Sequence, residues 1–406
     1  MTGIYRILAA GALAVCLTAP AGLRAKADDT ASPPDAKPAE TASPARETAS
    51  PPAKPQKELS PALAALRDRV RGTLAAQQKQ AFNTRENSAT EIMNYCLAFG
   101  CSTGVLLDGQ SGKQINGIAA LCFNYPCAGF EMLSTSQGHL APRIGYGYQE
   151  HPGEFLAMLA MSRVQPNYPA RTGKNTRTVA DLVEAEKLGC RSGGDASLKL
   201  IGLAYYVDDP QWKNDLGETW SLDRMVEEEL AQPIVAAPEG GLNRLLGLSF
   251  AVARRAKHGQ PLEGNFSRAQ KFVADFQEFA LQVQSTDGSW GPQFLAARST
   301  SQDAALQLRS SGRVLEWLAM SLSDNKLEDT RVVNAVDYVT RLLSSQRYQW
   351  NAQSLPTQEI AALGHAVHAL AIYDEREFKP ADVPEKPAVE QTPATASSEA
   401  TAPKSR

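Results

Sequence analysis

The feature that most constrains this chain is an apolar signature that recurs along much of its length. A small residue is followed by an aliphatic residue at the third position, by Leu at the sixth and by Ala or Ser at the seventh. These offsets share one face of an α-helix. Clear copies start at Gly153, Ser197, Gly312 and Gly364, a looser copy starts at Leu242, and a weaker sixth starts at Gly117. Successive starts lie 36 to 70 residues apart, which predicts a repeat of paired helices.

Helix start and stop signals agree with this repeat. Thr178 and Asp181 form a capping-box pattern, and Ser60-Pro61 and Ser221 are typical first residues of helices. The only strand expected is Gly104–Leu107, before an Asp-Gly turn. Helices are expected over residues 62–82, 222–230, 240–258, 268–284, 303–322, 331–344 and 358–373.

A second motif lies between the copies of the first. Gln284 is followed by Asp287-Gly288-Ser289-Trp290-Gly291, and Leu342, Gln346 and Trp350 form a second copy. This pattern resembles the glutamine-tryptophan repeat of squalene and oxidosqualene cyclases, which share the α/α-toroid superfamily with protein prenyltransferases. The resemblance implies an all-α fold, a single α/α toroid of about six helix pairs. It also implies that Trp290 and Trp350 clamp neighbouring repeats rather than bind a ligand.

The catalytic motifs of that superfamily are absent from the sequence. There is no Asp-x-Asp-Asp acid, and Asp208-Asp209 does not continue into a magnesium-diphosphate motif. No string matches the prenyltransferase zinc residues or the thioester of complement proteins, and no phosphate-binding glycine loop or Gly-x-Ser-x-Gly elbow occurs. We therefore expect no cofactor and no metal, because fold similarity does not carry a reaction with it.

The two ends of the chain differ in composition from its middle. Residues 1–27 have Arg6, an apolar run from Ile7 to Leu17 and an Ala-Lys-Ala end, as in a secretory signal peptide. Residues 28–58 form a linker rich in Pro, Ala and Thr, and residues 379–406 form a similar tail; both are expected to be disordered. The toroid is expected over residues 59–378, in an exported protein that is periplasmic, held in the cell envelope or secreted.

Net charge and hydropathy exclude two classes of partner. A formal net charge of −3 does not favour nucleic acid. The apolar run at residues 7–17 is shorter than the roughly 18 residues that cross a bilayer, so no transmembrane segment is expected in the mature chain. The expected partner is a protein, a lipid or a glycan.

Four cysteines lie close together in the sequence. Cys122 and Cys127 flank a turn-prone Asn-Tyr-Pro, whereas Cys96 and Cys101 can pair only if a helix ends near Gly100. Local disulfides, crossed disulfides, buried thiols and a zinc site remain open, the zinc spacing being the poorest match.

The richest polar segment precedes one copy of the signature. Its side chains could act as bases or bind an anion, as in an enzyme that eliminates or hydrolyses a polysaccharide. The other interpretation is that this segment is a loop that packs over the expected toroid and has no chemical role. The catalytic candidates are His139, Arg143, Tyr146, Tyr148 and His151.

Five further residues are candidates for ligand binding. Trp220 lies between Glu218 and Asp223, and His365 and His368 are one helical turn apart. Asp287 and Trp290 complete the set. Convergence of these residues with the His139–His151 loop would favour an enzyme. The sequence favours a non-catalytic binding or scaffold module for a protein, lipid or glycan, the alternative being an extracytoplasmic enzyme of the polysaccharide lyase, hydrolase or terpenoid cyclase type.

Overall fold

A computed structural model describes residues 59–80, 82–208, 210–349 and 355–378. The chain divides into two compact units, residues 1–52 and 53–406, and every described residue belongs to the second. The expected signal peptide (1–27), linker (28–58), C-terminal tail (379–406) and Trp350 lie outside the described residues, as does the side chain of Gln346.

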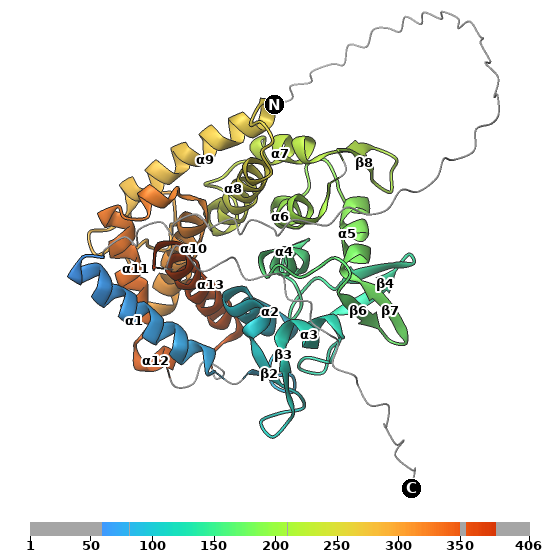
Figure 1. Ribbon diagram of the computed structural model, residues 1–406, viewed down its shortest axis with the longest axis horizontal. Helices are drawn as coiled ribbons and strands as arrows, with labels where there is room; N and C mark the ends of the chain where they lie inside the picture. The colour runs from blue at the N-terminus through green and yellow to red at the C-terminus, as the bar shows by residue number, and fades with distance from the viewer. Residues whose placement is uncertain (1–58, 81, 209, 350–354, 379–406) are drawn as a thin grey trace, which may run out of the picture. The chain divides into compact units, whose positions relative to one another are not determined.

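The described residues are mostly helical, as the sequence predicts, with only short pairs of strands (Figure 1). The expected helices are all present, with ends shifted by a few residues. The α-helices are α1 (Pro61–Gln78), α2 (Ala89–Phe99), α3 (Gly117–Cys122), α4 (Glu154–Met161), α5 (Val179–Leu188), α6 (Ser197–Tyr206), α7 (Leu222–Leu230), α8 (Leu242–Lys257), α9 (Gly264–Val283), α10 (Ala304–Ser321), α11 (Thr330–Leu343), α12 (Gln346–Gln349) and α13 (Thr357–Tyr373). Shorter turns are η1 (Gly100–Ser102), η2 (Pro238–Gly241), η3 (Asp324–Lys326) and η5 (Asp374–Phe378).

Side-chain caps explain where several helices begin. Ser60 Oγ accepts a hydrogen bond from the Leu63 amide at the start of α1. In the predicted capping box of α5, the Asp181 carboxylate accepts the Thr178 backbone N–H at 2.8 Å. Ser221 Oγ accepts from the Arg224 amide at 3.1 Å at the start of α7.

Six helices contact one another in a closed cycle. Helix α2 contacts α4, α4 contacts α6, and the cycle continues through α8, α10 and α13 back to α2. The remaining long helices pack outside this cycle, α5 on α4 and α6, α9 on α8, and α11 on α10 and α13 (Figure 1). The cycle helices are buried on most of their surface, whereas α7 and α11 bury one face only.

The recurrent signature marks five of these six helices, α4, α6, α8, α10 and α13. The weaker copy at Gly117 lies in α3, which contacts α2 but is not one of the six helices of the cycle. Helix α2 completes the cycle and carries no copy of the signature.

Small residues bring the cycle helices close together. A Cβ at Gly312 would lie 2.8 Å from Ala366 Cβ of α13, and one at Gly364 would lie 2.6 Å from the Asn94 carbonyl oxygen of α2. Gly247 of α8 approaches the Ser197 carbonyl of α6 in the same way. The small positions of the signature are therefore places where two backbones meet.

The strands lie in the connections between helices. The expected strand at Gly104 is confirmed as β2 (Gly104–Leu106), which pairs with β1 (Phe82–Asn83) and β3 (Gln114–Asn116). Three hairpins were not expected, because their strands span only two to four residues: β4–β5 (Leu133–Ser136, His139–Pro142), β6–β7 (Pro169–Thr172, Asn175–Thr178) and β8–β9 (Trp212–Lys213, Thr219–Trp220).

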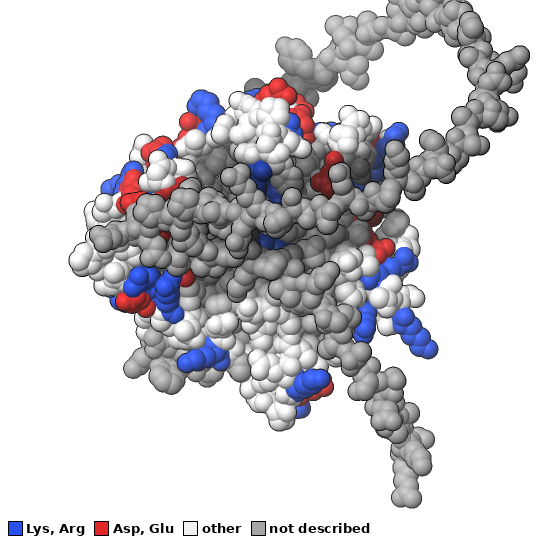
Figure 2. Space-filling view, viewed as in Figure 1, with Lys and Arg blue, Asp and Glu red and all other residues white. Residues whose placement is uncertain are grey.

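Charges of both signs are interspersed on the face shown in Figure 2, with basic side chains prominent over the β6–β7 hairpin. Arg171, Lys174 and Arg177 of this hairpin are exposed. No helix among the described residues combines the length and the apolar character that a membrane span requires.

Candidate functional site

A cavity of about 150 Å³ is lined by the helices of the cycle and by two of their connections. Residues of α2, α4, α6, α8, α10 and α13 contribute to its wall, together with Glu150, His151 and Glu239. One side is apolar, with Met93, Met158 and Met161. The other side carries charged groups from several elements, so the cavity brings together chemistry that is scattered in the sequence.

The centre of the charged side is a buried ion pair within α10. Arg313 is 3% exposed, and its Nη1 donates to Glu316 Oε2 at 2.7 Å. Its Nε donates to Glu239 Oε2 at 3.1 Å, and its Nη2 donates to Asn243 of α8. Burial would raise the pKa of Glu316, but the charges of His365 and Arg313 lower that pKa well below its usual range.

The two histidines of α13 share the Glu316 carboxylate. His365 Nδ1 lies 3.0 Å from Glu316 Oε2, and His368 Nδ1 lies 2.7 Å from Oε1. Because an ionised carboxylate only accepts hydrogen bonds, His368 carries its proton on Nδ1. Arg313 and Glu316 occupy the same repeat positions in α10 as His365 and His368 in α13, so equivalent positions of neighbouring repeats face each other. His365 lines the cavity and His368 does not.

Glu239 is held in the cavity wall by an unusual backbone. It has φ +52°, a region that non-glycine residues rarely adopt, and Gly240 and Gly241 follow with φ +62° and +72°. Both Nε and Nη2 of Arg309 donate to Glu239 Oε1, at 3.1 and 3.0 Å. Burial raises the pKa of Glu239, but Arg313, His365 and Arg309 outweigh burial and lower it to about 2.

On the opposite wall, His151 and Glu154 lie at the start of α4. His151 Nδ1 lies 3.4 Å from Asp195 Oδ2, and this hydrogen bond raises the pKa of His151. Glu154 Oε2 accepts the backbone N–H groups of Glu150 at 2.6 Å and His151 at 3.1 Å. Burial still raises the pKa of Glu154 above its usual value, in spite of these two hydrogen bonds.

Of the five catalytic candidates, only His151 lines this cavity. His139 begins β5 and is exposed, as is Arg143. Tyr146 is 92% exposed, and Tyr148 packs edge-on against Phe130. His151 therefore lies apart from the other four candidates. Gly145 and Gly147, which both have positive φ, change the direction of the chain before His151.

Asp287 and Trp290 lie in a turn away from the cavity. Asp287 Oδ1 accepts hydrogen bonds from Ser289 N and Oγ. Trp290 is 1% exposed, and its Nε1 donates to the Ala280 carbonyl at 2.8 Å. Gln284 Nε2 donates to the Arg331 carbonyl at the start of α11, so this motif ties α9 to the next helix pair.

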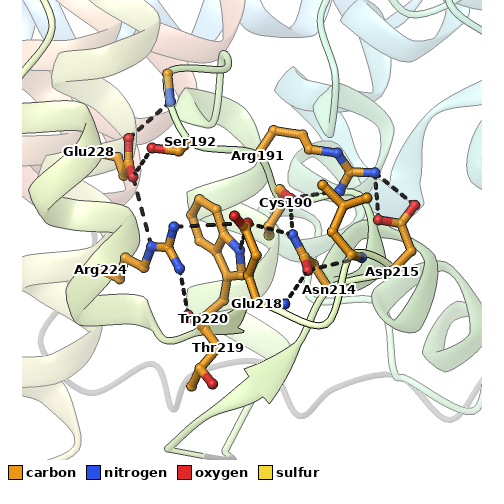
Figure 3. Close-up of polar contacts among 12 residues, drawn as sticks. Cys190, Arg191, Ser192, Asn214, Asp215, Glu218, Thr219, Trp220, Arg224 and Glu228 are labelled. Atoms are coloured by element: carbon orange, nitrogen blue, oxygen red, sulfur yellow. Dashed lines mark hydrogen bonds and ion pairs between the residues drawn. The ribbon is translucent and has the colours of Figure 1, made fainter. Parts of the chain in front are cut away.

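Trp220 is buried under an arginine rather than open to a ligand (Figure 3). The Arg224 guanidinium stacks 4.0 Å from the ring centroid, and its Nη1 donates to the Thr219 carbonyl at 2.7 Å. Glu218 accepts from Trp220 Nε1 and from Asn214 Nδ2. Asp223 accepts from Asn265 at the start of α9. These contacts hold the β8–β9 hairpin on α7.

The proposed cysteine pairs are not formed in the structure. Cys96, Cys122 and Cys127 are buried free thiols in the structure. Burial raises the pKa of Cys96 and of Cys127 to about 12. Cys127 Sγ instead donates to the Tyr125 carbonyl at 3.3 Å, and Cys96 packs where a Cβ on Gly117 would clash. Among the described residues, no three side chains are arranged to hold a metal ion.

Sequence reasoning missed Glu154, Glu239, Arg313 and Glu316. Two sequence signals could have identified three of these residues, Arg313, Glu316 and Glu239. Arg313 and Glu316 are charged residues inside an otherwise apolar repeat helix, and Glu239 precedes two glycines directly before another copy of the signature. Searches of protein-family models, curated proteins and solved structures found no match to this chain.

Proposed function

We propose that this chain is an exported α/α-toroid protein whose central cavity binds a small ligand. The closed cycle of helix contacts supports the toroid, as does the tie from Gln284 to the next helix pair. These features also support kinship with the cyclase and prenyltransferase superfamily, without its chemistry.

The observation that carries the binding function is the convergence of His151, Glu154, Glu239, Arg313 and His365 on one cavity. Groups that would cost free energy when buried are placed there by several separate elements. At about 150 Å³, the cavity matches one that holds a molecule of the size of benzene. A triterpene is several times larger, so the size favours a small molecule or one terminal unit of a polymer.

A second candidate function is acid–base catalysis in the same cavity. Its support is the pairing of His151 with Asp195 beside Glu154, because a histidine oriented by a carboxylate is a common general base. The pKa of Glu154 is raised and the pKa of Glu239 is lowered, so the two carboxyl groups differ in acidity as a general acid and its ionised partner do.

Native mass spectrometry of the full chain, purified from its own exported fraction, tests the binding function. We expect a retained small molecule, and we expect Ala361→Phe, which fills the cavity, to release it. Ala297→Phe on the exposed surface is the control. A bare chain, or a ligand that survives Ala361→Phe, would contradict the proposal.

The catalytic candidate predicts turnover that the binding function does not require. Incubation with polysaccharides should release new reducing or unsaturated ends, and His151→Asn and Glu154→Gln should each abolish this release. Retention of the ligand without any product would leave binding as the function. The export proposal is tested separately, since a mature N-terminus at Asp28 is expected by N-terminal sequencing.

A further inference from the structure

Charged groups of both signs lie in and beside the cavity. The acidic groups are Glu150, Glu154, Glu239, Glu316 and Asp195, and the basic groups are Arg309, Arg313, His151, His365 and His368. The two sets balance when all three histidines are charged, so a preference for cations must come from a carboxylate that has no ion-pair partner.

The carboxylates of the cavity differ in their partners. Glu239 and Glu316 are each paired with Arg313 at 3.1 Å or less. Glu154 forms no such ion pair with the described residues. Its Oε2 accepts two backbone amides, and its Oε1 has no hydrogen-bond partner among the described residues. Glu150 also lacks an ion pair but is exposed, so among the described residues Glu154 is the partly buried carboxylate of the cavity that still lacks a cation.

The wall beside Glu154 suits the carbon part of a small ligand. Met158 and Met161 belong to the same helix as Glu154, and Met93 of α2 lines the cavity with them. Thioether side chains are polarizable and adapt to irregular apolar groups. The cavity thus offers one unpaired carboxylate and an adaptable apolar wall in a space of about 150 Å³.

We propose that the cavity selects a small organic cation, an alkylammonium group that donates a hydrogen bond to Glu154 Oε1 and packs its carbon chain on the three methionines. This inference rests on the binding function proposed above and names the ligand class of that site. A buried ammonium is stable only beside a carboxylate that compensates its lost hydration, and Glu154 supplies that partner.

Three probes with one carbon skeleton test the charge preference. Isobutylammonium, isobutanol and isobutyrate are titrated into the full chain by isothermal calorimetry. We expect isobutylammonium to bind at least tenfold more tightly than the other two. Binding should strengthen as pH rises, because Glu154, whose pKa is raised by burial, becomes ionised and His151 loses its charge. The charged groups that face Glu154 are Glu150 and His151 of its loop, Glu239 of η2, Arg309, Arg313 and Glu316 of α10, and His365 of α13.

The variant Glu154→Gln should weaken isobutylammonium binding at least tenfold. Glutamine keeps an oxygen for the two backbone amides, so an unchanged melting temperature would show that the fold is intact. Glu227→Gln makes the same charge change on the exposed face of α7 and should leave the affinity unaltered.

The outcomes separate the two proposals. Tighter binding of isobutanol or isobutyrate, abolished by Ala361→Phe, would overturn the cation preference and leave a ligand-binding cavity. Equal binding of the three probes, or no binding of any, overturns the cation preference. An empty cavity in native mass spectrometry overturns the binding function itself.

Discussion

The Glu316 carboxylate of α10 has three basic partners, Arg313, His365 and His368, and its side chain is 1% exposed. Removing its charge leaves a buried arginine with one carboxylate fewer. We expect Glu316→Gln to lower the free energy of unfolding by about 3 to 5 kcal/mol, the cost of breaking a buried ion pair. Urea titration at pH 7 measures this loss.

The matched control is Glu278→Gln on α9. Glu278 forms an ion pair with Lys326 at 2.9 Å, and the two side chains are 50% and 42% exposed. An exposed pair contributes little, so this variant should change stability by less than about 1 kcal/mol. Similar losses in the two variants would contradict the role assigned to Glu316.

A second residue, Glu239, predicts how stability depends on pH. Its pKa falls from the usual 4.5 to about 2 in the folded chain, so the unfolded chain binds the proton more readily. The resulting stabilisation is fully present above about 4.5, is lost as pH falls towards 2, and is on the order of 3 kcal/mol. In urea titrations between pH 6 and pH 2.5, Glu239→Gln should lose stability less steeply than the natural chain. Parallel curves would contradict this assignment.

His151, His365 and His368 could be identified from sequence because histidine is rare in this chain and its chemistry is recognisable. Arg313 and Glu316 were missed although they interrupt an apolar repeat helix, since a charged pair in a helix is usually solvent-exposed and packing of α10 against α13 buries this pair. Glu239 was missed because its position depends on a backbone with positive φ. His139, Arg143, Tyr146 and Tyr148 do not line the cavity, and the sequence of a polar loop does not show which side chains turn inward.

At the scale of elements, the apolar signature predicted five of the six helices of the cycle, because its small and aliphatic residues lie on the face that packs against neighbouring helices. Helix α2 escaped notice because its buried face carries Ile92, Met93 and Cys96 instead of the leucine stripe. The close approach there is supplied by Gly364 of α13. The hairpins were missed because strands of two to four residues have no period to detect.

The glycine contacts predict the effect of one added methyl group. Gly364→Ala would place its Cβ 2.6 Å from the Asn94 carbonyl oxygen, so α13 and α2 must separate. We expect a loss of about 1 to 3 kcal/mol, typical of overpacking. Gly72→Ala is the control, because Gly72 lies inside α1 with nothing within 4 Å of a new Cβ. It should gain about 0.5 to 1 kcal/mol from helix propensity. A stable Gly364→Ala, measured by urea unfolding, would refute the close approach.

At the scale of the whole folded unit, the first and last helices of the cycle meet. Thr357 Oγ1 donates to Glu91 Oε1 at 2.6 Å, joining the start of α13 to the start of α2. Helix α1 also reaches the far end of the chain, since Arg71 Nη2 donates to the Phe378 carbonyl at 3.1 Å. Among the described helices, the first and the last of the cycle therefore contact each other, which an open helical array does not require.

Closure predicts that the chain can be cut and rejoined elsewhere. Leu59 lies about 18 Å along α1 from Arg71, a distance that a flexible linker of about ten residues covers. A circular permutant that joins Phe378 to Leu59 and opens between Gly259 and Gln260, in the exposed loop before α9, should therefore fold with one cooperative unfolding transition by circular dichroism. A permutant opened between Gly312 and Arg313, inside buried α10, should not fold. If the loop permutant also fails to fold, the natural ends cannot be joined without disrupting the structure. That result would contradict a closed cycle in solution.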